Sequence, residues 1–283
     1  MSPQRNSAET KLESHFEFGK NWEKLVSQLG DESVANAARA LAGFLEREDL
    51  RGLSFLDVGC GSGLSSLAAF QLGAKSIVSV DIDPQNIANV SRLRAKFSVP
   101  VDFSWTAWTA SIVNQEDLMK LPKADIVYSW GVLHHTGAMW EGLNNCSSLV
   151  APGGYLYIML YRDAILAPMW KWIKYFYTIS PRVVQSLMRN SFAGVLLLGA
   201  LLVGKNPLRI IRNYGKKSRG MSWYVDVTDW VGGYPFEYAS YREVVGFLEK
   251  RGFKLIKISP QPNEDLNLGY RGTGSYEYLL QKS

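Results

Sequence analysis

The segment LSFLDVGCGSGLSSLAAFQLGA, residues 53–74, decides the fold. Its apolar start at residues 53–58 is typical of a buried strand. The glycine-rich turn GCGSG follows at residues 59–63, and residues 64–72 then favour a helix. Glycines let the backbone turn tightly and approach a ligand, and the next helix offers free N–H groups. The segment predicts the first unit of an α/β fold with a ligand-binding turn. A tight turn without a ligand is the alternative.

The next apolar segment predicts a second strand with an acid at its end. SIVSVDIDPQ occupies residues 76–85, and Asp81 lies 22 residues after Gly59. Rossmann-type folds place a carboxylate against ribose hydroxyls at about 20 residues from the turn. The glycines here are spaced G-x-G-x-G, which is not the dinucleotide spacing G-x-G-x-x-G.

The motifs DVGCGSG at residues 57–63 and VDID at residues 80–83 together resemble the first two motifs of class I S-adenosylmethionine-dependent methyltransferases. Later strand and turn patterns agree, so the resemblance spans about residues 50–161 and 239–283. It implies an α/β, Rossmann-like seven-stranded sheet, mostly parallel with an antiparallel last strand, flanked by helices. It also implies a helical insertion after the fifth strand.

The resemblance implies S-adenosylmethionine as cofactor and S-adenosylhomocysteine as product. Asp57 would hold the amino group of the cofactor, directly or through water, and the turn glycines would leave room for its methionine part. Asp81 would bind the ribose beside Ile82 at the adenine. Asn114 stands where the family often has an acid. The glycines and the adenine-flanking residues that the resemblance assigns are Gly59, Gly61, Gly63, Ser111 and Ile112.

Two of the three histidines, His134 and His135, follow the strand predicted at residues 124–130. Ligands bind at the carboxyl ends of strands in open α/β sheets. A neutral histidine there can take a proton from an attacking hydroxyl, because its ordinary pKa lies near physiological pH. We therefore expect a general base, with His135 preferred over His134. Helix capping or a backbone hydrogen bond is the alternative for the pair. Trp130 is expected to line the site, or else to pack in the core.

Residues 221–237, MSWYVDVTDWVGGYPFE, combine carboxylates with aromatic rings. Asp226 and Asp229 lie three residues apart, so a helical turn would put them on one face. Such a set suits a polyhydroxylated or cationic acceptor. The alternative is a packed loop whose carboxylates pair with Arg219 or Arg242. The candidate acceptor-binding residues are Tyr161, Trp223, Asp226, Asp229, Trp230 and Tyr234.

The connection at residues 163–237 is far longer than usual in an α/β unit. Residues 162–220 hold eleven Lys or Arg and one Asp, although the net charge of the chain is only +5. We expect a mainly helical lid around the acceptor. Contact with an anionic membrane and a homo-oligomer interface are the alternatives. Nucleic acid is not expected, because the apolar runs are unlike a phosphate track. The longest apolar run, residues 192–204, is too short for a transmembrane helix.

The remaining features bound the organisation of the chain. Two cysteines give no disulfide framework, and no metal site is expected because no Cys/His cluster has zinc spacing. The polar N-terminus lacks the apolar core of a signal peptide, so we expect a cytoplasmic protein, with peripheral membrane contact left open. The expected parts are an N-terminal helical cap at 1–48, a cofactor-binding core at 49–162 and 238–283, and the insertion at 163–237.

In the cap, a lid over the cofactor is expected from Phe18, Asn21 and Trp22; a helix that covers a sheet edge is the alternative. The sequence as a whole predicts methyl transfer from S-adenosylmethionine to a hydroxyl of a small-molecule, sugar or lipid-linked acceptor. Two other functions stay open. One is methylation of carbon or nitrogen by proximity and orientation. The other is a non-catalytic partner protein that binds the cofactor.

Overall fold

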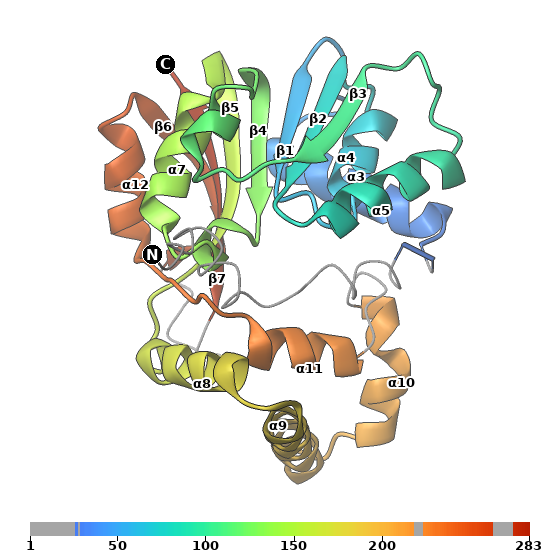
Figure 1. The fold of residues 1–283 in the computed structure, drawn as a ribbon, viewed down its shortest axis with the longest axis vertical. Helices are drawn as coiled ribbons and strands as arrows, with labels where there is room; N and C mark the ends of the chain where they lie inside the picture. The colour runs from blue at the N-terminus through green and yellow to red at the C-terminus, as the bar shows by residue number, and fades with distance from the viewer. Residues whose placement is uncertain (1–25, 28, 218–222, 263–273) are drawn as a thin grey trace, which may run out of the picture.

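Seven strands form one mixed sheet in the order β3-β2-β1-β4-β5-β7-β6 (Figure 1). The computed structural model describes residues 26–27, 29–217, 223–262 and 274–283. β7 runs antiparallel to both of its neighbours, β5 and β6, and the other pairings are parallel. The predicted fold class is therefore confirmed. The strands are β1 (Ser54–Val58), β2 (Ser76–Asp81), β3 (Trp105–Thr109), β4 (Ala124–Trp130), β5 (Val150–Tyr161), β6 (Phe253–Ser259) and β7 (Ser275–Lys282).

Two apolar cores cover the two faces of the sheet. Neighbouring strand residues alternate between them, because side chains of a strand point to opposite faces. Phe55 and Ile126 lie in one core, and Leu56 and Val127 lie in the other. The first core is closed by α3 (Asp31–Leu45), α4 (Leu64–Gln71) and α5 (Pro84–Lys96). The second is closed chiefly by α7 (Met139–Ser148) and α12 (Tyr241–Glu249).

Helix α3 belongs to a covering layer. Its buried residues Val34, Ala38, Leu41 and Leu45 recur at helical spacing and pack in the same core as α4. The lid residues expected upstream, Phe18, Asn21 and Trp22, lie outside the described residues. The division of the chain into cap, core and insertion stays a prediction.

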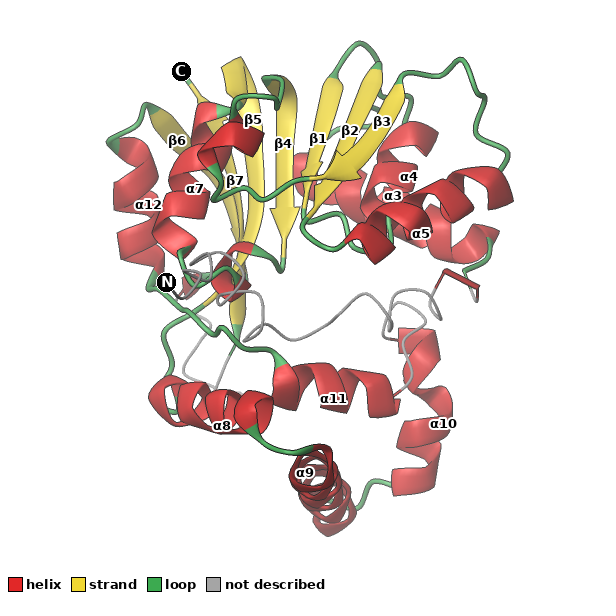
Figure 2. Ribbon diagram, viewed as in Figure 1, coloured by secondary structure: helices red, strands yellow, loops and turns green. Residues whose placement is uncertain are grey.

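In its described residues, 163–217 and 223–237, the insertion folds as four helices beyond the end of the sheet to which β4 points (Figure 2). They are α8 (Ala167–Ile179), α9 (Arg182–Leu202), α10 (Pro207–Lys217) and α11 (Trp223–Gly232). Two small apolar clusters hold them together, one around Trp170 and Phe236 and the other around Ala193, Trp223 and Val227. The insertion therefore lies at the carboxyl edge of the parallel strands, where open α/β sheets bind ligands.

Helix α9 corrects one expectation from the sequence. The apolar run at residues 192–204 is short, but the helix extends back to Arg182 and comprises 21 residues. Among the described residues it is one helix long and apolar enough, by length and composition alone, to cross a membrane. The expectation that no segment reaches that length is wrong. A run of contiguous apolar residues understates the length of an apolar helix, because a helix also gathers apolar residues spaced three and four apart.

Candidate active site

The glycine turn after β1 is tightly held by the chain itself. Gly59, Gly61 and Gly63 all have positive φ angles, 76°, 52° and 79°. A Cβ atom on Gly59 would lie 2.4 Å from the Cγ atoms of Val132, and one on Gly63 would lie 2.9 Å from Val90. The turn thus needs glycine for its backbone conformation and for close packing. The contact with Val132 also brings the loop after β4 directly against the turn.

Asp57, at the end of β1, is a buried carboxyl group. It accepts a hydrogen bond of 2.6 Å from the Ser66 hydroxyl, whose oxygen lies 2.7 Å from the Ser79 hydroxyl. Burial, together with the nearby charge of Asp81, raises the pKa of Asp57 to about 7, although the Ser66 bond acts in the opposite direction. A cationic group bound beside it would favour the charged form. Asp57 therefore fits an ammonium partner.

Asp81, at the end of β2, is buried and fixed by the backbone. Its two carboxylate oxygens accept hydrogen bonds from the N–H groups of Gly61, at 2.9 Å, and Asp83, at 3.0 Å. Burial raises its pKa, and these two bonds oppose the rise. Each carboxylate oxygen keeps further lone-pair capacity, so Asp81 can also accept from a pair of hydroxyls. The next residue, Ile82, is an exposed apolar side chain. A ribose and its adenine fit this pair.

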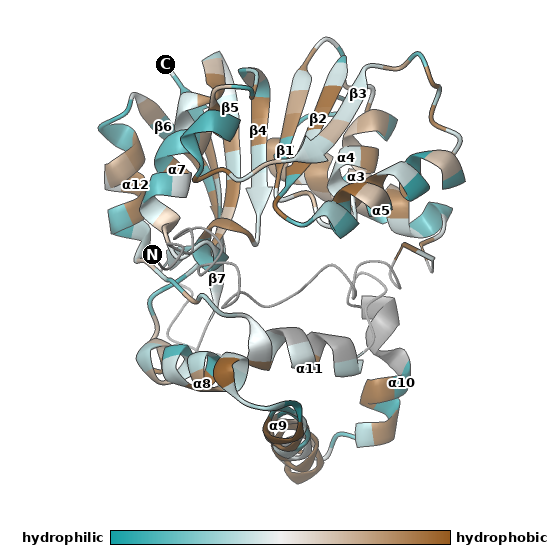
Figure 3. Cartoon of the chain, viewed as in Figure 1, coloured by the Kyte–Doolittle hydropathy of each residue, from teal (hydrophilic) through white to brown (hydrophobic). Residues whose placement is uncertain are grey.

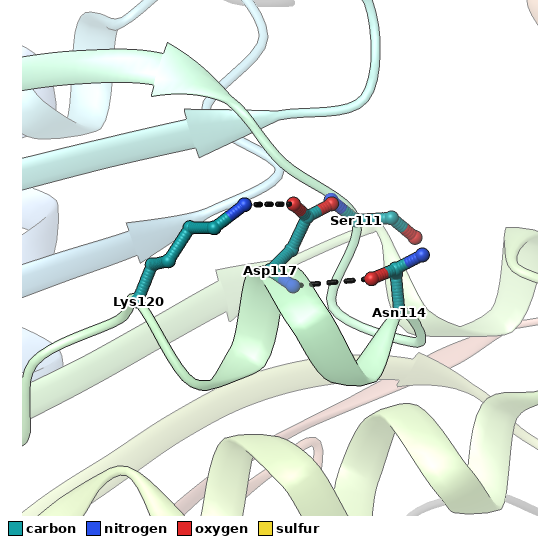
Figure 4. A network of polar contacts seen from close by, with 4 residues as sticks. All are labelled: Ser111, Asn114, Asp117 and Lys120. Carbon is teal, nitrogen blue, oxygen red and sulfur yellow. Dashed lines mark hydrogen bonds and ion pairs between the residues drawn. The ribbon is translucent and has the colours of Figure 1, made fainter.

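In the loop after β3, the polar side chains make hydrogen bonds and an ion pair within the loop and the short helix that follows it (Figure 4). The Asn114 side chain accepts from Asp117 N–H at 3.1 Å and so caps the short helix α6 (Gln115–Leu118). The Asp117 carboxylate accepts from Ser111 N–H at 2.9 Å and pairs with Lys120 at 3.6 Å. Ile112 is buried in the sheet core. The side chains of Asn114 and Ile112 thus have roles within the protein.

The two histidines lie in a single 3-10 turn, η1 (Leu133–His135), but in different environments. His134 is fully buried. Burial lowers its pKa well below the ordinary value, and the nearby Lys174 and a protonated His135 act in the same direction, so His134 is neutral. His135 is half-buried, and its Nδ1 lies 2.7 Å from the carbonyl oxygen of Pro235. A carbonyl only accepts, so Nδ1 of His135 carries a proton, and in the neutral imidazole the lone pair is therefore on Nε2.

Tyr161, at the end of β5, joins the histidines to the insertion. Its ring centroid lies 3.9 Å from that of His134 and 5.5 Å from that of His135. Phe236 and Trp230 follow at 5.0 and 6.2 Å. The structure therefore brings together two of the predicted acceptor residues, Tyr161 and Trp230, with both predicted catalytic residues.

Two more predicted acceptor residues, Trp223 and Tyr234, have contacts elsewhere in the insertion. Trp223 packs in the apolar cluster between α9 and α11. The Tyr234 ring lies 5.3 Å from that of Tyr175 on α8. Asp226 and Asp229 do lie on one helix, α11, but their side chains are outside the described set. Trp130 is half-buried and packs against the core under α3 and α4.

Three residues near the histidines were not singled out from the sequence. The Pro235 carbonyl orients His135. The Glu237 carboxylate accepts from Met139 N–H at 2.9 Å, and burial raises its pKa. Lys174 is fully buried, donates to the Trp230 carbonyl, and has its Nζ 4.6 Å from the Trp230 ring centroid. Only Lys174 had a signal: it falls at helical spacing from Trp170 and Tyr177, on the apolar side of α8.

Comparison with known proteins gives the class of this fold. Residues 56–156 match a family described as a methyltransferase domain. A ubiquinone biosynthesis O-methyltransferase of Parvibaculum lavamentivorans is 35% identical over 121 residues, 43% of each chain. A ribosomal protein L11 methyltransferase of Tolumonas auensis is 34% identical over 116 residues, 40% of this chain and 37% of the relative. The matches therefore span less than half of these two relatives.

A solved structure extends the likeness beyond the matched domain. The [4+2]-cyclase SpnF superposes with a TM-score of 0.51 at 12% identity, over 87% of this chain and 80% of that one. That likeness concerns the fold alone, which is the Rossmann-like α/β class. The matched domain and its relatives identify residues 56–156 as a methyltransferase domain, which supports the class I S-adenosylmethionine-dependent methyltransferase that the two motifs predicted.

Proposed function

We propose that this protein binds S-adenosylmethionine and transfers its methyl group to an oxygen of a small-molecule, sugar or lipid-linked acceptor. The observation that carries the proposal is the hydrogen bond between His135 Nδ1 and the Pro235 carbonyl. It gives a histidine at the carboxyl edge of the sheet the tautomer that a general base needs.

The cofactor-binding half of the proposal rests on the turn and the two carboxyl groups. Asp57 suits the amino group of the cofactor, because burial has raised its pKa to about 7 and an ammonium would offset that cost. Asp81 suits the ribose hydroxyls, and the exposed Ile82 suits the adenine face. When bound, the cofactor supplies an electrophilic methyl group on a sulfonium. The contact between Gly59 and Val132 puts the histidine loop beside the turn.

His135 would take the proton of the acceptor hydroxyl at Nε2 as the oxygen attacks. The Pro235 carbonyl then receives a stronger hydrogen bond, because Nδ1–H of an imidazolium is a better donor. The rings of Tyr161 and His135 meet at an interplanar angle of 89°, and this contact limits the rotation of the imidazole. A positioned base of this kind contributes about 10²–10⁴-fold. His134, neutral and buried, would support Tyr161 from the other side.

The acceptor would lie between the histidine turn and the insertion, against Tyr161 and Trp230. Pro235 belongs to the last residues of the insertion, so the segment that meets the acceptor also orients the base. The predicted parts of the chain then have distinct roles: residues 49–162 and 238–283 hold the cofactor, and residues 163–237 recognise the acceptor. A cytoplasmic location is part of the same proposal.

The test is transfer of radiolabelled methyl from S-adenosylmethionine into an extract of the source cells, partitioned between organic solvent and water. His135→Gln should lose about 10²–10⁴-fold in rate while cofactor affinity is kept. Lys254→Ala, at an exposed site on β6, is the control and should match the wild type. A rate that survives His135→Gln would favour carbon or nitrogen methylation. Cofactor binding without turnover in any extract would favour a non-catalytic partner protein.

A further inference from the structure

The outer side of α9 carries apolar residues where a surface helix normally carries polar ones. α9 lies on the side of the insertion remote from the sheet and is largely brown in Figure 3. Leu187 and Leu198 leave 68% and 58% of their surface exposed. Only 11% of the apolar window of this helix is buried, so it is not a core helix. The exposed large apolar residues of α9 are Val183, Leu187, Val195, Leu198, Leu201 and Leu202.

The neighbouring helices carry exposed apolar residues too. On α8 they recur at steps of three and four, so they form one stripe along the helix: Met169, Trp172, Phe176 and Ile179. Leu208 and Ile211 are exposed on α10. Soluble monomers rarely expose apolar surface on this scale, and such surface marks an interaction site. The apolar outer surface of α8, α9 and α10 is called the insertion surface below.

The charge around the insertion surface selects its partner. Residues 164–212 contain seven Lys or Arg and no Asp or Glu. A second copy of the chain would bring two positive surfaces together, and nucleic acid would leave the leucines against phosphates. An anionic lipid surface suits both the positive charges and the apolar side chains, since the cations meet the headgroups and the apolar side chains enter the acyl boundary. The exposed cations are Lys171, Arg182, Lys205, Arg209 and Arg212.

We propose that the insertion surface docks on a membrane rich in anionic lipids, with α9 lying in the membrane plane. The other side of α9 packs Ala193 with Trp223 and Phe192 with Trp170. A helix crossing the bilayer would have to leave both clusters, whereas a helix in the membrane plane keeps them. This inference goes beyond the proposed function and stands whether or not the chain transfers a methyl group.

The test is flotation of the full chain with phosphatidylcholine vesicles and with mixed phosphatidylcholine–phosphatidylglycerol vesicles. We expect binding to the anionic vesicles that weakens as salt is added. Arg209→Gln and Arg212→Gln should each weaken it about fivefold. The double variant Leu187→Ser/Leu198→Ser should lose most of it. Val101→Ser/Met119→Ser is the matched control on the sheet domain, because these residues are 96% and 80% exposed, and it should bind like the wild type.

A second readout follows one side chain. Trp172 is 71% exposed, so its emission should shift to the blue on anionic vesicles, and Trp172→Phe should abolish that part of the shift. Equal binding of the leucine variant and the wild type, or no binding by the wild type, would overturn the proposal. A wild-type dimer that dissociates in the leucine variant would also overturn the proposal. Bound protein that resists an alkaline carbonate wash would overturn it as well, because such resistance indicates a helix that spans the membrane. Methyl transfer is measured on the same samples, so that a failure of membrane binding can be told apart from a failure of the proposed function.

Discussion

Replacing Gly59 by alanine tests whether the glycine turn and the histidine loop are in direct contact. The φ of 76° at Gly59 costs an L-residue about 1–2 kcal/mol. The new Cβ would also lie 2.4 Å from both Cγ atoms of Val132, and overpacking of this kind costs about 1–3 kcal/mol more. We expect Gly59→Ala to lower the free energy of unfolding by about 2–5 kcal/mol. Urea denaturation followed by circular dichroism measures this.

The chain offers a control that separates the two costs. Gly153 has nearly the same φ, 75°, but a Cβ there would meet no atom within 4 Å. Gly153→Ala should therefore show only the backbone cost. Adding Val132→Ala to Gly59→Ala should recover part of the packing cost. If Gly59→Ala is no worse than Gly153→Ala, or if Val132→Ala recovers nothing, the contact between turn and loop is refuted.

Three further predictions concern the base, the buried carboxyl group and the anchoring of the insertion. The wild-type transfer rate should fall at acid pH, because a protonated histidine cannot act as a general base, and His135→Gln should lose this dependence. A pH–rate profile that keeps its shape in the variant would contradict the base. Folding raises the pKa of Asp57 from 3.8 to about 7, so the folded state holds the proton more tightly than the unfolded state. Without cofactor, the free energy of unfolding should therefore fall as pH rises from about 4 to 7, and it should fall less in Asp57→Asn. Urea titrations at several pH values measure this, and an equal pH dependence in the wild type and the variant would refute it. Trp170→Ala should lower the free energy of unfolding by about 3–5 kcal/mol, because the ring is buried against Phe192 and Trp230. Trp172 is exposed on the same helix, so Trp172→Ala should change that free energy by no more than about 0.5 kcal/mol. Equal thermal shifts of the two variants would count against the packing of the insertion.

The sheet and its first two motifs were predictable because their signals are local. A buried strand, a glycine turn and a helix follow each other within residues 53–74, and the acid after the second strand stands at a fixed spacing. The structure puts Asp57 and Asp81 at adjacent strand ends, as parallel pairing of β1 and β2 requires. Here β1 and β2, which follow each other in the chain, are also neighbours in the sheet.

The histidine pair and the insertion were harder, because their environments depend on distant segments. Adjacent residues of a 3-10 turn point in different directions, and no letter of the sequence says that His134 faces the core while His135 meets Pro235, 100 residues away. The burial of Trp223 and Lys174 depends on helix packing in the same way, and the role of Trp223 at an acceptor site stays a prediction.

The same long-range contact links acceptor recognition to catalysis in the proposed mechanism. The Pro235 carbonyl fixes the tautomer of His135, and the Glu237 N–H donates to the His134 carbonyl at 2.9 Å. Both residues end the insertion, whose position depends on Trp170 and Phe236. If the base were set by the sheet alone, changes in the insertion would alter only acceptor affinity. Because the base is held by the insertion itself, a change that shifts α8 or α11 should lower kcat together with acceptor affinity, while cofactor affinity stays unchanged.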